Sequence, residues 1–162
     1  MKNLINPLAN KNRRSFLSRL SQLSLATIGA LLFPTFSFAK KQEADEAIQK
    51  ITGGALVKDG RVTLVIPPLV ENGNLVVLKV GVQSPMTAND YVKAIYVVAE
   101  GNPFPNIFTA YLTPRSGTAN ITTRVRLADS QTVWAIAHMS DGSFWRGSAE
   151  TLVTLSACTE VV

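Results

Sequence analysis

The sequence predicts an all-β fold, an immunoglobulin-like antiparallel β-sandwich preceded by one short α-helix. Three observations predict it: strand-forming residues dominate from Arg61 onward, they occur in short runs, and turn-forming residues separate the runs. Seven short strands at this spacing are typical of two packed antiparallel sheets. The expected strands are 62–66, 75–82, 92–99, 107–112, 119–127, 132–139 and 144–155.

The helix is expected first, over residues 43–51. Acidic residues come early in this segment and Lys50 comes late, an order that suits the helix dipole. Gly53 and Gly54 follow and are expected to end the helix. Its apolar residues recur at spacings of three and four, as one buried helix face requires, at Ala44, Ala47, Ile48 and Ile51.

The strands follow, and their pattern predicts which side of each is buried. Apolar and polar residues alternate regularly in 62–66 and again in 133–137, which predicts strands with one buried face. The strongest turn prediction is at Asp141 and Gly142, because an Asp-Gly pair readily adopts the positive φ angles of a tight hairpin. This turn would join strand 132–139 to the last strand.

The first 39 residues are expected to be an export signal that is removed. Basic residues come first, a mostly apolar run over 20–33 follows, and small residues precede a cleavage point after Ala39. The run is interrupted by polar residues and falls short of the roughly 20 apolar residues of a membrane span, so no membrane anchor is expected after removal. Arg13 and Arg14, followed by Phe-Leu, resemble a twin-arginine signal, which predicts a periplasmic protein.

The mature chain is expected to be one sandwich domain over 40–155 with a C-terminal arm over 156–162. Its size suits a single core. The export signal holds five of the 16 Lys and Arg residues and none of the 11 Asp and Glu residues, so the mature part is neutral. A basic surface for nucleic acid is therefore not expected.

The residues that carry chemistry are few. His138 is the only histidine and Cys158 the only cysteine, so a blue-copper site, which needs two histidines and a cysteine, is excluded by counting. A zinc site held only by this chain's histidine and cysteine fails by the same count. A serine hydrolase triad is not expected, because Ser140 and Asp141 lie too close to His138 along an extended strand and turn to line up in relay geometry. No metal, no cofactor and no catalytic residue is expected, and His138 is expected to be an ordinary strand residue on an outward or interface face.

Cys158 is the candidate functional residue. It lies four residues from the C-terminus, beyond the last expected strand and beside polar Thr159 and Glu160, so an exposed position is expected. A lone cysteine in an oxidising compartment cannot form an internal disulfide. If the chain leaves the sandwich at Ser156, the thiol would lie roughly 10 Å beyond the last paired residue.

Several segments, taken in order, resemble the SoxY family, the sulfur carriers of bacterial thiosulfate oxidation. The resemblance implies an immunoglobulin-like sandwich with an N-terminal helix, twin-arginine export, and a heterodimer with a cysteine-free sister sandwich, SoxZ. It also implies that Cys158 carries sulfur covalently and is loaded with a sulfur oxyanion by a c-type cytochrome. The segments are 71–74, 84–86, 92–95, 99–103, 124–128 and 140–145.

The arm departs from the pattern of that family, in which glycine pairs flank the cysteine. Here Ser156 and Ala157 precede Cys158, and Thr159 and Glu160 follow it. This arm is stiffer than a glycine arm, and the negative charge of Glu160 disfavours the reactive thiolate. The hypothesis is a divergent carrier, served by co-adapted enzymes or no longer loaded in the usual way.

Two rival functions are open at this point. The chain could be an exported interaction protein that uses Cys158 only for an intermolecular disulfide with a partner. It could also be a thiol-dependent redox or transfer enzyme, although no residue adjacent in sequence would activate the thiol.

Overall fold

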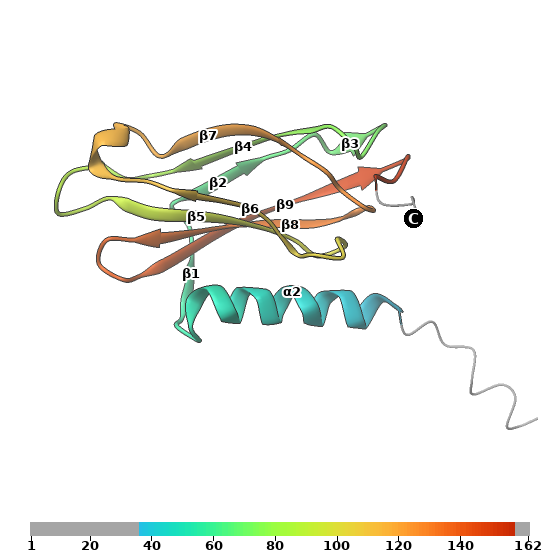
Figure 1. The fold of residues 1–162 in the computed structure, drawn as a ribbon, viewed down its shortest axis with the longest axis horizontal. Coiled ribbons are helices and arrows are strands. Elements are labelled where there is room, and N and C mark those ends of the chain that lie inside the picture. Colours follow the sequence, from blue (N-terminus) through green and yellow to red (C-terminus); the bar gives the residue numbers. More distant parts are fainter. Residues whose placement is uncertain (1–35, 158–162) are drawn as a thin grey trace, which may run out of the picture. The chain divides into compact units, whose positions relative to one another are not determined.

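The computed structural model describes residues 36–157 of the 162-residue chain, with side chains from Lys41 onward (Figure 1). Two β-sheets pack face to face, and helix α2 (Phe36–Thr52) lies on the outer face of one of them. The predicted sandwich with one N-terminal helix is therefore confirmed. All seven predicted strands are present, together with two short strands that the sequence did not predict.

The first sheet has six strands and the second has three. In the first, the order is β1-β9-β8-β5-β6, and β3 also pairs with β9; in the second, the order is β2-β4-β7. A single 3-10 turn, η3 (Pro114–Ser116), lies between β6 and β7. The strands are β1 (Val57–Asp59), β2 (Val62–Val65), β3 (Leu69–Val70), β4 (Val76–Val82), β5 (Val92–Ala99), β6 (Asn106–Tyr111), β7 (Asn120–Val125), β8 (Gln131–Met139) and β9 (Phe144–Val153).

From β1 to β4 the chain changes sheets at every step, three times in all. β1 pairs in parallel with the start of β9, β2 joins the other sheet, and β3 returns to pair in parallel with the end of β9. The crossing point needs Gly147, because a Cβ atom there would lie 2.4 Å from the Val62 carbonyl oxygen. Together β1 and β3 cover both ends of the β9 edge, which would otherwise be open to pairing with another chain.

The core between the sheets is built from the inward faces of the strands. β4 alternates strictly, with Val76, Leu78 and Val80 buried and the residues between them exposed. β5 does not alternate, because helix α2 covers its second face. Burial of each large core side chain, such as Leu78 or Ile95, stabilises the fold by about 1.5–3 kcal/mol.

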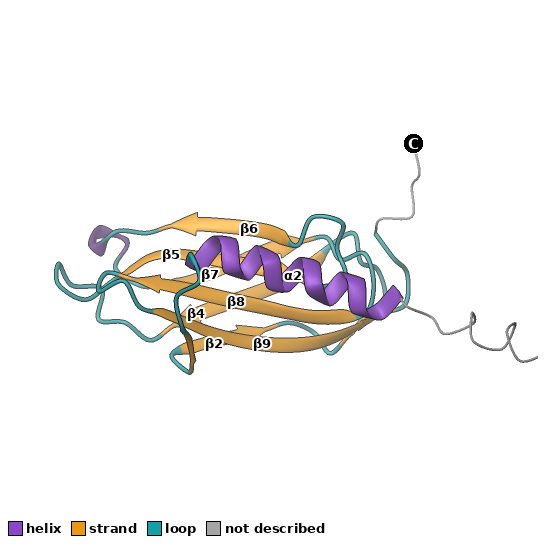
Figure 2. Ribbon diagram, turned by 90° about the horizontal axis from the view of Figure 1, so that it is seen from below, coloured by secondary structure: helices purple, strands orange, loops and turns teal. Residues whose placement is uncertain are grey.

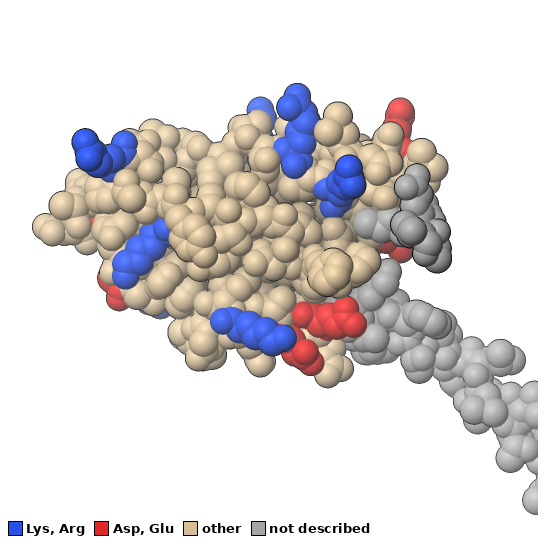
Figure 3. Space-filling model, viewed as in Figure 1, with Lys and Arg blue, Asp and Glu red and all other residues tan. Residues whose placement is uncertain are grey.

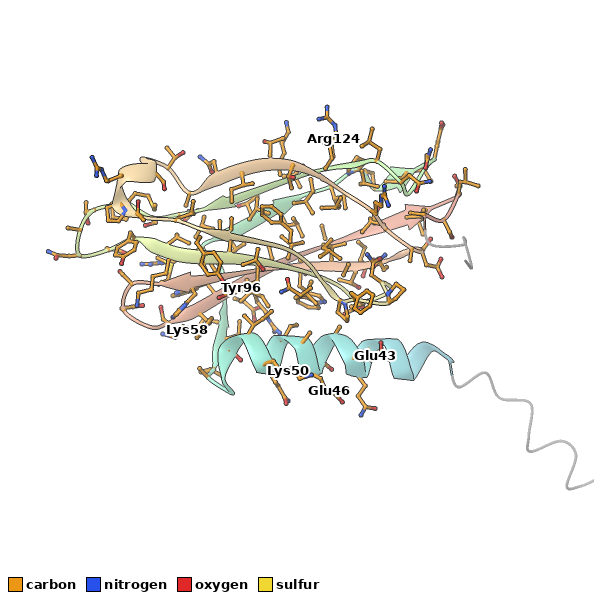
Figure 4. All side chains as sticks on the ribbon, viewed as in Figure 1. Glu43, Glu46, Lys50, Lys58, Tyr96 and Arg124 are labelled. Atoms are coloured by element: carbon orange, nitrogen blue, oxygen red, sulfur yellow. The ribbon has the colours of Figure 1, made fainter. Side chains whose placement is uncertain are left out.

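Helix α2 packs along the outer face of the six-stranded sheet (Figure 2). Ala44 is buried in a small cluster with Val98, Ile136 and Phe144, and the other predicted apolar positions of the helix are partly buried against it. Glu46 and Lys50 lie on the side of the helix that faces away from the sheets (Figure 4). Among the residues described, no helix is both long enough and apolar enough to span a bilayer.

The end of α2 lies one residue beyond the prediction, whereas its start lies well before the predicted one. The helix ends at Thr52, and Gly53 and Gly54 follow with positive φ angles of 62° and 80°, as a helix stop requires. It begins at Phe36, seven residues before the predicted start at residue 43. The predicted cleavage point after Ala39 thus falls in its first turn, whereas Arg13 and Arg14 lie outside the described residues.

The β8–β9 hairpin turns at the predicted Asp-Gly pair. Asp141 Oδ1 accepts hydrogen bonds from the backbone N–H of Ser143 (2.8 Å) and from its hydroxyl (2.7 Å), and these bonds lower the pKa of Asp141. Gly142 has a φ of 83°, but Asp141 does not have a positive φ. The turn therefore relies on the side chain of Asp141 and on the backbone freedom of Gly142.

Candidate functional site at the arm base

The last three described residues, Leu155, Ser156 and Ala157, form the arm base. The Gly73 N–H donates a hydrogen bond to the Leu155 carbonyl (2.8 Å), and the Ala157 N–H donates one to the Leu127 carbonyl (3.2 Å). The Leu127 N–H in turn donates to the Gly73 carbonyl (2.9 Å). We call these three hydrogen bonds the arm clasp, because they hold the arm base on the end of the sandwich.

Gly73 makes the clasp possible. It is buried, and a Cβ atom at this position would lie 2.3 Å from the Leu127 oxygen and 3.1 Å from the Ala157 nitrogen. Both atoms belong to the backbone, so no side-chain rotation could relieve the contact. Next to it, Asn72 Oδ1 accepts hydrogen bonds from the N–H (2.9 Å) and the side-chain amide (3.1 Å) of Asn74, which fixes the loop around the glycine.

The chain between β9 and the arm base is also held. The Thr154 N–H donates to the Val70 carbonyl (3.0 Å), and the Thr154 hydroxyl donates to the Glu71 carbonyl (3.1 Å). On the other side, the Val153 N–H donates to the Ser130 hydroxyl (2.9 Å). Hydrogen bonds therefore hold the chain at Val153 and Thr154, before the arm base begins.

This geometry corrects the expected course of the arm. The prediction had the chain leave the sandwich at Ser156, but Ser156 and Ala157 are half-buried and the backbone of Ala157 is bonded to Leu127. The two residues that stand in place of glycines thus lie on the body of the protein. Cys158, Thr159 and Glu160 lie outside the described residues, and Cys158 is joined directly to the clasped Ala157.

A second polar network, centred on Asn102, holds residues 126–128 on the β5–β6 loop. The side-chain amide of buried Asn102 donates to the Arg126 carbonyl (2.9 Å), and Asn102 Oδ1 accepts from the Ala128 N–H (2.9 Å) and from Gln131 Nε2 (3.1 Å). In the sequence, Asn102 lies between the expected strands 92–99 and 107–112, where turn-forming residues are expected. The structure gives it a second role, because residues 126–128 hold the β5–β6 loop through Asn102 and the arm base through Leu127.

His138 lies far from the arm base. Its ring stacks on Phe144, with centroids 4.4 Å apart, at the start of β9, whereas the arm follows the end of that ten-residue strand, about 30 Å away. Burial, and then the charge of Lys93, lower the pKa of His138, while Asp141 opposes them. The structure therefore does not bring the histidine to the arm as a base for a thiol.

On the one face that Figure 3 shows, the basic side chains are dispersed. On the face shown in Figure 3, Lys and Arg side chains are spread over the sandwich, and carboxylates gather over the N-terminal half of α2. Arg124 points outward from β7 (Figure 4). Within residues 36–157, no three His, Cys, Asp or Glu side chains come together as ligands for a metal ion.

A family model described as "Sulfur oxidation protein SoxY" matches residues 48–158, from the last turn of α2 to Cys158. No curated protein is similar enough to match the chain. Among solved structures, the sulfur carrier protein SoxY from Chlorobium limicola f thiosulfatophilum is 21% identical with a TM-score of 0.59, covering 70% of this chain and 98% of that one.

Superoxide reductases share the fold as well. The superoxide reductase (neelaredoxin) from Ignicoccus hospitalis is 21% identical with a TM-score of 0.51, covering 58% of this chain and 80% of its own. A putative superoxide reductase from Thermotoga maritima is 20% identical with a TM-score of 0.51, and the match covers 60% of this chain and 93% of that one. At such identities the structures show a common fold, and the family match carries the assignment to a family.

Proposed function

Because the chain belongs to the SoxY family of sulfur oxidation proteins, we propose that it is a sulfur carrier, not a catalyst, and that Cys158 holds the sulfur covalently. The observation that carries this proposal is the extent of the family match, which runs from α2 to Cys158 itself. The fold likeness to the Chlorobium sulfur carrier supports it. The sandwich presents the arm, and partner enzymes perform the chemistry.

The proposed cargo is thiosulfate, and its attachment is an oxidation. The Cys158 thiolate and the outer sulfur of thiosulfate form an S–S bond, giving a cysteine S-thiosulfonate, and two electrons pass to a partner c-type cytochrome. Water then cleaves the terminal sulfonate as sulfate with release of two protons, which leaves a persulfide on the cysteine. A partner haem oxidoreductase then oxidises that persulfide to a cysteine S-sulfonate: three water molecules supply the oxygen atoms, six protons are released, and the haem enzyme accepts six electrons. A last hydrolysis with water releases the sulfonate as a second sulfate with two protons and regenerates the thiolate.

The proposed setting is the periplasm. The predicted signal with Arg13 and Arg14 supports twin-arginine export, and the family supports a heterodimer with a SoxZ-like sister sandwich. Cleavage after Ala39 would leave α2 from residue 40 onward, which retains Ala44 and Ile48 on the sheet. Removal of the signal is thus compatible with the packed helix.

The arm is proposed to be that of a divergent carrier. With the clasp formed, Ala157 is held on the body of the protein, so entry of Cys158 into a deep enzyme cleft requires the clasp to open. A glycine arm would add backbone freedom that Ser156 and Ala157 lack. Enzymes that serve this carrier would therefore have a wider entrance or would open the clasp on docking.

Intact-protein mass spectrometry of material from the periplasm, with and without thiosulfate, tests the proposal. An added mass of thiosulfonate or sulfur on the wild type, absent from Cys158→Ser, is the expected result. A doubled chain mass that a reductant reverses would instead support the rival function, an intermolecular disulfide. Material that never gains sulfur mass in the presence of its partner enzymes would overturn the carrier.

A further inference from the structure

An aromatic ring is held in solvent beside the arm base. Phe104 is 84% exposed, the most exposed large apolar side chain among the described residues, and it lies in the loop between β5 and β6. Burial of such a ring would stabilise a fold, so a ring left exposed within an apolar patch points to an interaction site. Exposed aromatic side chains are common anchors of protein interfaces.

The loop around Phe104 is rigid. Pro103 and Pro105 flank the ring and restrict the backbone on both sides, and the Ala99 N–H donates to the Pro105 carbonyl (2.8 Å) across the base of the loop. The Gly101 N–H donates to Gln131 Oε1 (2.7 Å). A ring held in this way loses little conformational entropy when a partner binds it.

The loop that carries Phe104 and the arm base are bonded to neighbouring residues of one segment, 126–128. The side chain of Asn102, two residues before the ring, is bonded to the backbone of Arg126 and Ala128, and the Ala157 N–H is bonded to Leu127 between them. The β5–β6 loop and the arm base accordingly lie at the same end of the sandwich (Figures 1 and 2). Anything that receives the arm must approach this end.

A shallow hollow of about 530 Å³ adjoins the ring. Its lining is mainly apolar and includes Pro103, Phe104 and Ile107, with Arg126 as its charged member. We call these four residues the Phe104 patch. An apolar anchor beside a hollow and a cation suits a partner with an apolar recess for the ring and a carboxylate for Arg126.

We propose that the Phe104 patch is the docking contact for the sulfur-oxidising enzymes that take up the arm, an inference that rests on the proposed function. A permanent sister subunit must leave the arm end free, because several enzymes visit it in turn. A second copy paired about a two-fold axis through this patch would place two Arg126 side chains of like charge in one small interface. An enzyme that binds only transiently needs a small contact with one strong anchor, and the patch supplies such a contact.

The test compares Phe104→Ser with Tyr111→Ser in the full carrier with its sister subunit. Tyr111 is a matched control, because it is 79% exposed and lies at the opposite end of β6. One assay is thiosulfate loading of Cys158 by the thiosulfate-oxidising c-type cytochrome of the proposed function. The other is alkylation of the Cys158 thiol by iodoacetamide, a small reagent that needs no docking.

Phe104→Ser should lower kcat/KM for enzymatic loading by about tenfold or more, mainly through KM, as loss of an interface anchor does. Its alkylation rate should stay at the wild-type value, Tyr111→Ser should change neither rate, and Phe104→Tyr should restore most of the loading. Equal loading of wild type and Phe104→Ser would overturn the inference and leave the carrier function standing. A parallel fall in alkylation would also overturn it, since the ring would then act on the arm.

Two other outcomes would each overturn the inference in a different way. A wild-type carrier that reacts with iodoacetamide but is never loaded by the enzyme would overturn the proposed function, and the inference with it. A wild type that dimerises in sedimentation, while Phe104→Ser is monomeric, would show that a second copy occupies the patch and would overturn the assignment to an enzyme.

Discussion

Gly73→Ala is the sharpest perturbation of the arm clasp. The new Cβ atom would lie 2.3 Å from the Leu127 carbonyl oxygen, well inside any tolerated contact, so the loop must move away from Leu127. That movement breaks the three backbone hydrogen bonds of the clasp. At about 0.5–1.5 kcal/mol each, their loss predicts destabilisation of roughly 3 kcal/mol, which corresponds to a fall in Tm of about 10 °C for a domain of this size.

Two assays measure this effect. Urea denaturation gives the free energy of unfolding, and NMR amide exchange under native conditions reports the clasp directly, because the Ala157 and Leu127 N–H groups donate two of its bonds. In Gly73→Ala, both amides should lose protection. The arm base should then be free of the sandwich, although the sheets remain folded.

Gly147→Ala and Gly81→Ala are matched controls. A Cβ at Gly147 would lie 2.4 Å from the Val62 carbonyl oxygen, another backbone atom, so a similar loss of stability is expected with the Ala157 amide still protected. At Gly81 the nearest atom, 2.9 Å away, is Asn120 Oδ1, which can rotate aside, so a loss below about 1 kcal/mol is expected. If Gly73→Ala keeps both wild-type stability and the protection of Ala157, the arm is not held as described.

Three further predictions concern the neighbouring network, the distant hairpin and the arm. Asn102→Ala leaves buried backbone groups without their partner, so urea denaturation should show a loss of about 1–3 kcal/mol; a loss below about 0.5 kcal/mol would contradict the anchoring role. Because burial lowers the pKa of His138, the unfolded chain binds a proton at higher pH than the folded chain. The free energy of unfolding should therefore decline as the pH falls below about 6.5. If it declines just as steeply with pH in His138→Phe, His138 is not the cause. The double variant Ser156→Gly, Ala157→Gly should exchange the amides of the arm base several-fold faster than the wild type, with the stability of the sandwich unchanged. Equal exchange rates in the variant and the wild type would show that backbone stiffness does not hold the arm base.

The long strands could be predicted from the sequence because their signals are local. The alternation and the turn residues predict β2 and every strand from β4 through β9, and the glycine pair predicts the end of α2. β1 and β3 were missed because strands of three and two residues carry no period, and because their pairing depends on β9, more than 80 residues later. The early start of α2 could not be predicted, because the residues around Ala39 match the pattern of a signal cleavage point and not that of a helix start.

The site could be predicted only in its position along the chain. The sequence predicts a cysteine-bearing arm after the last strand, and the family match reaches that cysteine. The sequence could not predict the clasp. Gly73 allows two backbone segments that are distant in sequence to approach closely, and such a contact leaves no local pattern. Asn102 was hidden for the same reason, since a turn asparagine and a buried cross-linking asparagine look alike in sequence.

The parallel pairing of β3 with the end of β9 has a mechanical consequence. The strand that leads into the arm is bonded to β8 on one edge and to β1 and β3 on the other. A pull on the arm along the strand axis therefore loads many backbone bonds in shear at once, instead of peeling them off singly. If a partner enzyme pulls on the arm, as the proposed function implies, these bonds share the force and the β-sandwich stays folded.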